Sequence, residues 1–224
     1  TGEDIRRRRR RAAVESTGLN ILMKLAVAAA IVVSTYYAIV RVAEEKANAL
    51  AGGQTVVLDR ESREEWEAFA ALRERLHEWG ESDLAVALRR LQESGDLWVA
   101  PALEGGRSAI SVSVLRLQRV FVKGDELVAR DLPFPDLDIP EPAQRTFATI
   151  RLAGTLFHEL QHHEGLDDES ATYEREIEWY RGLRARMLER LQGEERRRFE
   201  WAIDSAIQTA TAAREKAKGS GRES

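Results

Sequence analysis

The sequence predicts an α+β protein in which a mainly helical domain with a small antiparallel sheet follows one N-terminal transmembrane helix. Three patterns support this fold class. Residues 19–42 are almost all apolar. Between residues 61 and 218, apolar side chains recur every three or four positions over several long stretches, which is helix spacing. A short central region, residues 97–129, contains runs that alternate apolar and polar side chains, which is strand spacing.

The composition limits the chemistry that the chain can perform. Its 224 residues carry a formal net charge of −4, with acidic and basic side chains interspersed. That distribution gives no overall basic field, so we expect no nucleic-acid partner. The chain has no Cys, which excludes disulfides, thiolate metal sites and Cys nucleophiles. No pattern in the sequence indicates an oligomeric state.

Residues 19–42 are predicted to anchor the chain in a membrane. An apolar helix of roughly 20 residues spans the hydrocarbon core, and this segment is long enough. Lys24 is the only charged residue between Leu19 and Val40, and it lies near the end of the segment, where it can reach the interface. Residues 1–18 form a basic tail with six consecutive Arg. Because basic flanks stay in the cytoplasm, the N-terminus is predicted to be cytoplasmic and the C-terminal domain extracytoplasmic.

Two other interpretations of the apolar segment remain. It can be a cleaved signal, with Ala47-Asn48-Ala49 as the cleavage site, although charged residues just before that site disfavour cleavage. It can also be a buried core helix, which the flanking Arg run and the length disfavour. We predict that residues 43–60 form a tether containing a Gly-Gly break, and that the polar residues 219–224 form a disordered tail.

The folded domain is predicted at residues 61–218, and it begins with a helical hairpin. Ser62 and Glu65 have the spacing of a capping box, and a helix with apolar residues at 3–4 spacing then runs to Gly80. A second helix covers about 82–93 and stops at Gly95.

Strands are predicted next, before a proline-rich loop. Residues 97–99 and 110–114 have extended patterns, and 120–123 and 127–129 flank a Gly-Asp pair that predicts a hairpin or a meander. Four Pro between residues 133 and 142 predict a rigid irregular loop.

The next predicted helix, from about residue 142 to a stop at Gly165, carries the sequence His158-Glu159-Leu160-Gln161-His162. This H-E-x-x-H spacing places two imidazoles one turn apart on one face, as a zinc site requires. Gly154, one turn earlier, leaves room for a ligand, a neighbouring chain or a helix–helix contact. The two His point away from an apolar stripe that holds the helix in place, formed by Thr149, Leu152, Ala153, Leu156, Phe157 and Leu160.

Residues 155–162 resemble the active-site helix of the zincin metallopeptidases, and an acidic segment at the start of a further amphipathic helical region, 167–216, resembles the gluzincins among them. The resemblance implies a zincin-like fold and a membrane-anchored zinc-dependent endopeptidase that acts on a peptide or protein substrate. His158 and His162 would hold Zn²⁺, and Glu159 would act as the general base. Carried over by position, Glu169 is the third ligand.

Several assignments around this helix have alternatives. Asp168 and Glu174 are the other candidates for the third ligand, and acids at a helix N-terminus are also favoured by the helix dipole. His163 is predicted to be a surface or outer residue. Tyr173 is predicted to lie in the core, with stabilisation of an oxyanion as its alternative role. A strand at 110–114 or 120–122 can align an extended peptide by strand addition.

Two other functional classes fit parts of the sequence. Glu74 and His77 repeat the E-x-x-H spacing of Glu159 and His162, and paired E-x-x-H units occur in di-iron carboxylate proteins. The chain can also be a catalytically silent, membrane-tethered interaction protein that keeps a zincin-like fold.

Overall fold

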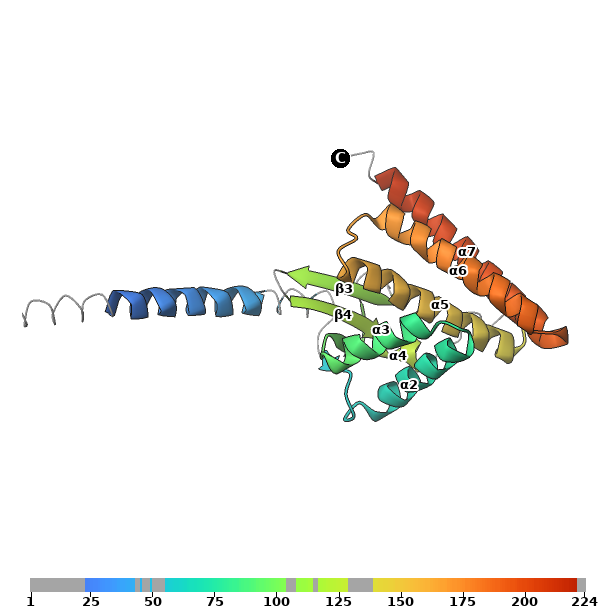
Figure 1. The fold of residues 1–224 in the computed structure, drawn as a ribbon, viewed down its shortest axis with the longest axis horizontal. Coiled ribbons are helices and arrows are strands. Elements are labelled where there is room, and N and C mark those ends of the chain that lie inside the picture. The colour runs from blue at the N-terminus through green and yellow to red at the C-terminus, as the bar shows by residue number, and fades with distance from the viewer. Residues whose placement is uncertain are drawn as a thin grey trace, which may run out of the picture. The chain divides into compact units, whose positions relative to one another are not determined.

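A computed structural model describes residues 23–42, 45, 49, 55–103, 108–114, 117–128 and 139–220 (Figure 1). The chain divides into two compact units, Thr1–Lys46 and Ala47–Ser224. The predicted basic tail, 1–18, the start of the predicted anchor and most of the predicted tether lie outside the described residues. The same holds for residues 129–138 and 221–224.

The first unit contains one apolar helix, Met23–Val42, which is long and apolar enough to span a membrane. Its mean hydropathy is 1.9, and its large side chains are exposed, with Val32 and Tyr37 both 68% accessible. A signal sequence near an N-terminus has the same properties. The helix therefore confirms an apolar segment of spanning length, whereas its topology stays a prediction.

The second unit is mostly helical, with a small four-stranded sheet. The helices are α2 (Arg63–Glu78), α3 (Ser82–Glu93), α4 (Gly124–Leu127), α5 (Glu141–His163), α6 (Glu169–Arg190) and α7 (Gly193–Ser220). The predicted stops at Gly80, Gly95 and Gly165 are confirmed, and each glycine has a positive φ. The predicted capping box is not formed, because the Ser62 hydroxyl donates to the Val57 carbonyl at 3.4 Å instead.

The sheet is mixed, so the predicted antiparallel sheet is wrong. Its order is β1 (Val56–Val57), β2 (Leu97–Ala100), β4 (Leu117–Lys123) and β3 (Ala109–Val114), and β2 and β4 run parallel. The chain leaves β2, forms the outer strand β3, and returns as β4 between the two. β3 pairs antiparallel with β4. Because β3 is the last strand in the order, it is an edge strand of the described sheet.

Two predicted boundaries are corrected by this sheet. The hairpin expected at 120–123 and 127–129 does not form, because Gly124–Leu127 is the short helix α4, with Leu127 buried and Glu126 paired with Arg151 of α5. Residues 56–58, expected in the tether, belong to the folded unit. β1 pairs with β2, and Leu58 is 1% exposed, with its N–H bonded to the Leu97 carbonyl at 3.0 Å.

The long helix α5 lies at the centre of the unit. It contacts the strands β3 and β4 and the helices α2, α6 and α7. Figure 1 shows α6 and α7 running side by side as an antiparallel pair, with Leu191 and Gln192 between them in the sequence. α7 continues to Ser220, so the first residues of the predicted disordered tail are helical. The main core lies between these helices and the inner face of the sheet, and α5 supplies Ile150, Leu152, Ala153, Leu156 and Leu160 to it.

Candidate metal centre

His158 and His162 meet on one face of α5. Their ring centroids are 4.8 Å apart, and their Nε2 atoms are 3.1 Å apart. The prediction that these imidazoles share a face is therefore confirmed. Within the group, His158 is only 6% exposed, whereas His162 is half-buried. α6 and the edge strand β3 both contact α5.

Glu169, the first residue of α6, completes a group of three donors. The chain turns back at Gly165, where φ is +96°, a value that L side chains rarely adopt. The Glu169 carboxylate then lies 3.3 Å from His158 Nε2 and 3.7 Å from His162 Nε2. The three residues have the donor atoms of a metal site, all within 4.8 Å of one another.

The two alternative third ligands have other roles. Asp168 caps α6, where its carboxylate accepts a hydrogen bond from the Ala171 N–H at 2.7 Å. Glu174 is exposed and lies 3.7 Å from Arg214 of α7. Neither belongs to the group formed by His158, His162 and Glu169 in the described part of the chain.

The outer nitrogens of both imidazoles are held by hydrogen-bond acceptors. His162 Nδ1 lies 2.6 Å from the Leu166 carbonyl, and His158 Nδ1 lies 3.1 Å from the buried Glu176 carboxylate. A carbonyl and a carboxylate only accept, so both Nδ1 atoms carry hydrogen. In the neutral imidazoles both Nε2 lone pairs then face each other and the Glu169 carboxylate. Three acceptors that converge in this way can hold a cation between them.

The pKa shifts of His158, His162 and Glu169 also favour positive charge on the imidazoles. Burial lowers the pKa of His158, but hydrogen bonds with Glu169 and Glu176 outweigh it and raise the pKa to about 9. The hydrogen bond with Glu169 also raises the pKa of His162, and the two His hold the pKa of Glu169 well below its usual range. Without a metal, protons supply the positive charge.

The three residues fit zinc by donor type and by spacing. Zinc is bound by imidazole nitrogen and carboxylate oxygen at roughly 2.0–2.2 Å in tetrahedral geometry, which separates neighbouring donors by roughly 3.3–3.6 Å. The observed separations of 3.1, 3.3 and 3.7 Å bracket that range. Hydrogen bonds to the outer nitrogens of ligating His are also the usual arrangement, because they fix the tautomer.

Glu159 lies beside the group, between α5 and β3. Its carboxylate is 7% exposed and accepts a hydrogen bond from the Ser111 N–H. Burial raises its pKa, against the lowering effect of His158 and His162. A buried carboxylate beside two imidazoles is a candidate for general acid–base chemistry.

Sequence reasoning missed Glu176 and its neighbour Tyr180. Both lie on the stripe of α6 that faces α5, together with Glu169 and Tyr173. Those four positions follow a spacing of 4, 3 and 4 residues, which is one face of a helix, and polar side chains on a buried face were the available signal. Tyr173 is half-buried, with its ring centroid 4.4 Å from that of His158.

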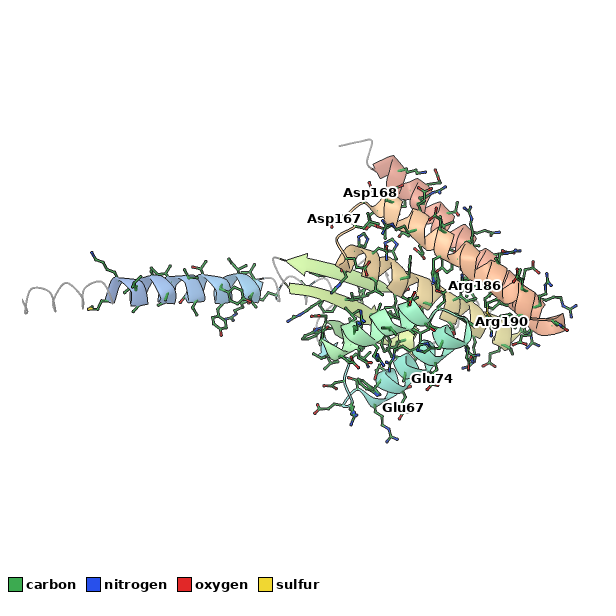
Figure 2. The ribbon with its side chains drawn as sticks, viewed as in Figure 1. Glu67, Glu74, Asp167, Asp168, Arg186 and Arg190 are labelled. Carbon is green, nitrogen blue, oxygen red and sulfur yellow. The ribbon has the colours of Figure 1, made fainter. Side chains whose placement is uncertain are left out.

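The remaining predicted residues lie outside the group. His163 is half-buried, and its Nε2 is buried without a hydrogen-bond partner among the described residues. Glu74 and His77 are exposed on α2. Figure 2 shows Glu74 at the far side of the unit from Asp167 and Asp168, which mark the turn beside the candidate metal centre. The structure therefore does not bring the two E-x-x-H units together as a di-iron site requires.

Comparison with known proteins returned no match among protein-family models, curated proteins or solved structures.

Proposed function

We propose that the chain is a membrane-anchored zinc-dependent endopeptidase. The observation that carries this proposal is the convergence of His158 Nε2, His162 Nε2 and the Glu169 carboxylate, with both Nδ1 atoms tied to acceptors. Such a group holds a cation through three protein donors, and in tetrahedral geometry it leaves one position for water, as in catalytic zinc sites.

The residues around the group account for the chemistry. A bound zinc supplies Lewis acidity that lowers the pKa of its water toward 7. Glu159 would take a proton from such a water and return it to the leaving amine. Its burial excludes bulk water from the carboxylate and keeps its pKa raised.

The edge strand β3 supports a peptide as the substrate. Ser108 faces β4, because its carbonyl accepts from the Lys123 N–H at 2.9 Å. Backbone groups alternate along a strand, so Ala109 and Ser113 present their N–H and C=O groups to the edge that pairs with no other described strand, whereas the Ser111 N–H on that edge donates to Glu159. An extended peptide can pair with those groups beside Glu159 by strand addition.

The apolar helix and the basic tail support a single-pass membrane anchor. Met23–Val42 has spanning length, and the Arg run precedes it in the sequence. Basic flanks stay in the cytoplasm, which orients the second unit to the extracytoplasmic side. The substrate is then a peptide or protein of that compartment.

The test uses the full chain in detergent, loaded with zinc and incubated with a peptide library. We expect cleavage that a chelator abolishes and zinc restores. Glu159→Gln is expected to keep zinc and to lose about 10²–10⁴-fold in kcat/KM, because only the proton acceptor is removed. Glu74→Gln, the same change on α2, is the matched control and is expected to cleave like wild type.

Two outcomes contradict this proposal. Turnover retained by Glu159→Gln excludes Glu159 as the base. Stoichiometric zinc without cleavage of any peptide supports the silent interaction protein, which the engagement of Glu159 by the Ser111 N–H also favours.

A further inference from the structure

Behind His158 lies a second buried layer of polar groups that the proposed reaction does not use. Glu176 is 5% exposed and Tyr180 is 1% exposed. Both come from α6, one turn apart, and both face α5. Buried carboxylates and hydroxyls are costly unless they are hydrogen-bonded, so the presence of two such groups in a core position requires a reason.

Glu176 links the layer to His158. One Glu176 oxygen lies 3.1 Å from His158 Nδ1, and Tyr180 follows Glu176 by one helical turn on the same face of α6. Burial and the nearby Glu176 charge raise the pKa of Tyr180 well above its ordinary value, so the hydroxyl keeps its proton and remains a donor. The Glu176 carboxylate thus accepts from the His158 imidazole, and the Tyr180 hydroxyl is the next polar group behind it.

Gly154 makes the arrangement sterically possible. A Cβ added at Gly154 would overlap the Tyr180 hydroxyl and the ring carbons next to it. Any other residue at this position would displace Tyr180 from its place against α5. Gly154 lies one helical turn before His158, so the space that it leaves lets Tyr180 pack against α5 close to His158. This resolves the sequence-based alternatives in favour of a helix–helix contact.

We propose that Tyr180 and Glu176 are positioning residues that hold the His158 imidazole as the Nδ1–H tautomer and aim its Nε2 at the metal. The inference rests on the proposed metal centre, and not on peptide cleavage. A carboxylate behind a metal-binding His raises its basicity and fixes its ring, and loss of such a partner typically weakens metal binding by about 10- to 100-fold.

The rival explanation is that Tyr180 merely fills the core. Tyr180→Phe distinguishes the two explanations, because this change keeps the ring and removes the hydroxyl. A filler role predicts unchanged zinc affinity. A positioning role predicts weaker zinc binding and a change in the electronic state of the His158 ring.

The experiment measures zinc affinity by chelator competition on the full chain in detergent, together with NMR of ¹⁵N-histidine-labelled protein. The chain has four His, so the ring signals can be separated, and the His158 signal is identified by its loss in His158→Gln. We expect Tyr180→Phe to weaken zinc binding by about 10-fold and Glu176→Gln by about 10- to 100-fold. Both are expected to shift the His158 Nδ1 resonance.

Ile177→Val is the matched control for a structural effect. Ile177 is 1% exposed on the same helix, and this change trims the core without touching a polar group. We expect a lower melting temperature with unchanged zinc affinity. Equal weakening of zinc binding by Ile177→Val and Tyr180→Phe, or wild-type affinity with an unshifted His158 signal in Tyr180→Phe, overturns the proposal.

The same data separate this inference from the proposed peptidase. Tight zinc binding that depends on Tyr180, without cleavage of any peptide, supports the positioning role and contradicts the peptidase. A wild-type chain that binds no zinc overturns both.

Discussion

Two helices of this chain carry the same E-x-x-H spacing, and only one of them forms a candidate metal centre. On α2, Glu74 and His77 are exposed, and His77 Nδ1 is 3.1 Å from the Ser82 hydroxyl. On α5, Glu159 is buried, and His162 faces His158 and Glu169. A helix places two side chains on one face, but a metal requires a third donor from elsewhere, and α6 supplies it only at α5.

The surroundings also determine the free-energy penalty of each polar group on the two helices. Water solvates the Glu74 and His77 side chains, so α2 needs no partners for them. At α5, burial penalises every unpaired polar atom. The three motif side chains there have partners. His158 pairs with Glu169 and Glu176, His162 pairs with the Leu166 carbonyl, and Glu159 pairs with the Ser111 N–H. The spacing is therefore a necessary feature of the site, and the packing of α6 and β3 on α5 distinguishes the two helices.

The largest expected difference between the two helices is in zinc affinity when one imidazole is removed from each. We expect His162→Ala to weaken zinc binding by more than about 100-fold, beyond the loss expected for an outer partner, because a direct donor is removed. His77→Ala is expected to leave zinc affinity unchanged and the free energy of unfolding within about 0.5 kcal/mol of wild type. Chelator competition and denaturant unfolding measure the two quantities.

The comparison fails if His77→Ala weakens zinc binding as much as His162→Ala. That result would make both E-x-x-H units metal ligands and would favour the di-iron alternative.

Local patterns in the sequence predicted most of the helices. The spacing of apolar residues located α2, α3 and α5, and glycines at 80, 95 and 165 marked their ends, because both signals depend only on nearby residues. The candidate ligands His158 and His162 were found for the same reason, since helix geometry alone places them together.

Long-range pairing was not predictable in the same way. The Gly124-Asp125 pair resembles a hairpin turn, yet burial of Leu127 and pairing of Glu126 with Arg151 of α5 favour a helical turn there. The parallel pairing of β2 with β4 depends on where β3 lies, which no local pattern specifies. Glu176 was missed because an acid in a sequence with many acids shows its burial only when α6 packs on α5.

A smaller effect tests which carboxylate completes the group. We expect Glu169→Gln to weaken zinc binding by about 10- to 100-fold, less than His162→Ala, because an amide oxygen still offers a neutral donor. Glu174→Gln, a matched change on the same helix, is expected to retain wild-type affinity, because Glu174 lies beside Arg214. The measurement is again chelator competition. Equal affinities in the two variants would remove Glu169 from the site.

The smallest expected effect is on how the free energy of unfolding of the metal-free protein depends on pH. We expect the histidines of α5, and not His77 of α2, to cause this dependence. The folded-state pKa of His158, about 9, lies above its ordinary value of 6.5, so its proton stabilises the folded state fully below pH 6.5. That contribution is lost as the pH rises through about 9. His162 acts in the same direction, whereas the lowered pKa of Glu169 affects stability only at acidic pH. Glu169 is 51% exposed, which screens the interaction and limits the loss to the order of 1 kcal/mol.

Urea unfolding of chelator-treated protein at pH 6, 7.5 and 9 measures this loss. Zinc-loaded protein is expected to show a weaker decline, because the metal then occupies the position that the proton holds in its absence. In metal-free His158→Gln the decline is expected to shrink, while in His77→Ala it is expected to persist. A decline that His77→Ala removes and His158→Gln retains would assign the pH dependence to α2 and reverse the distinction between the two helices.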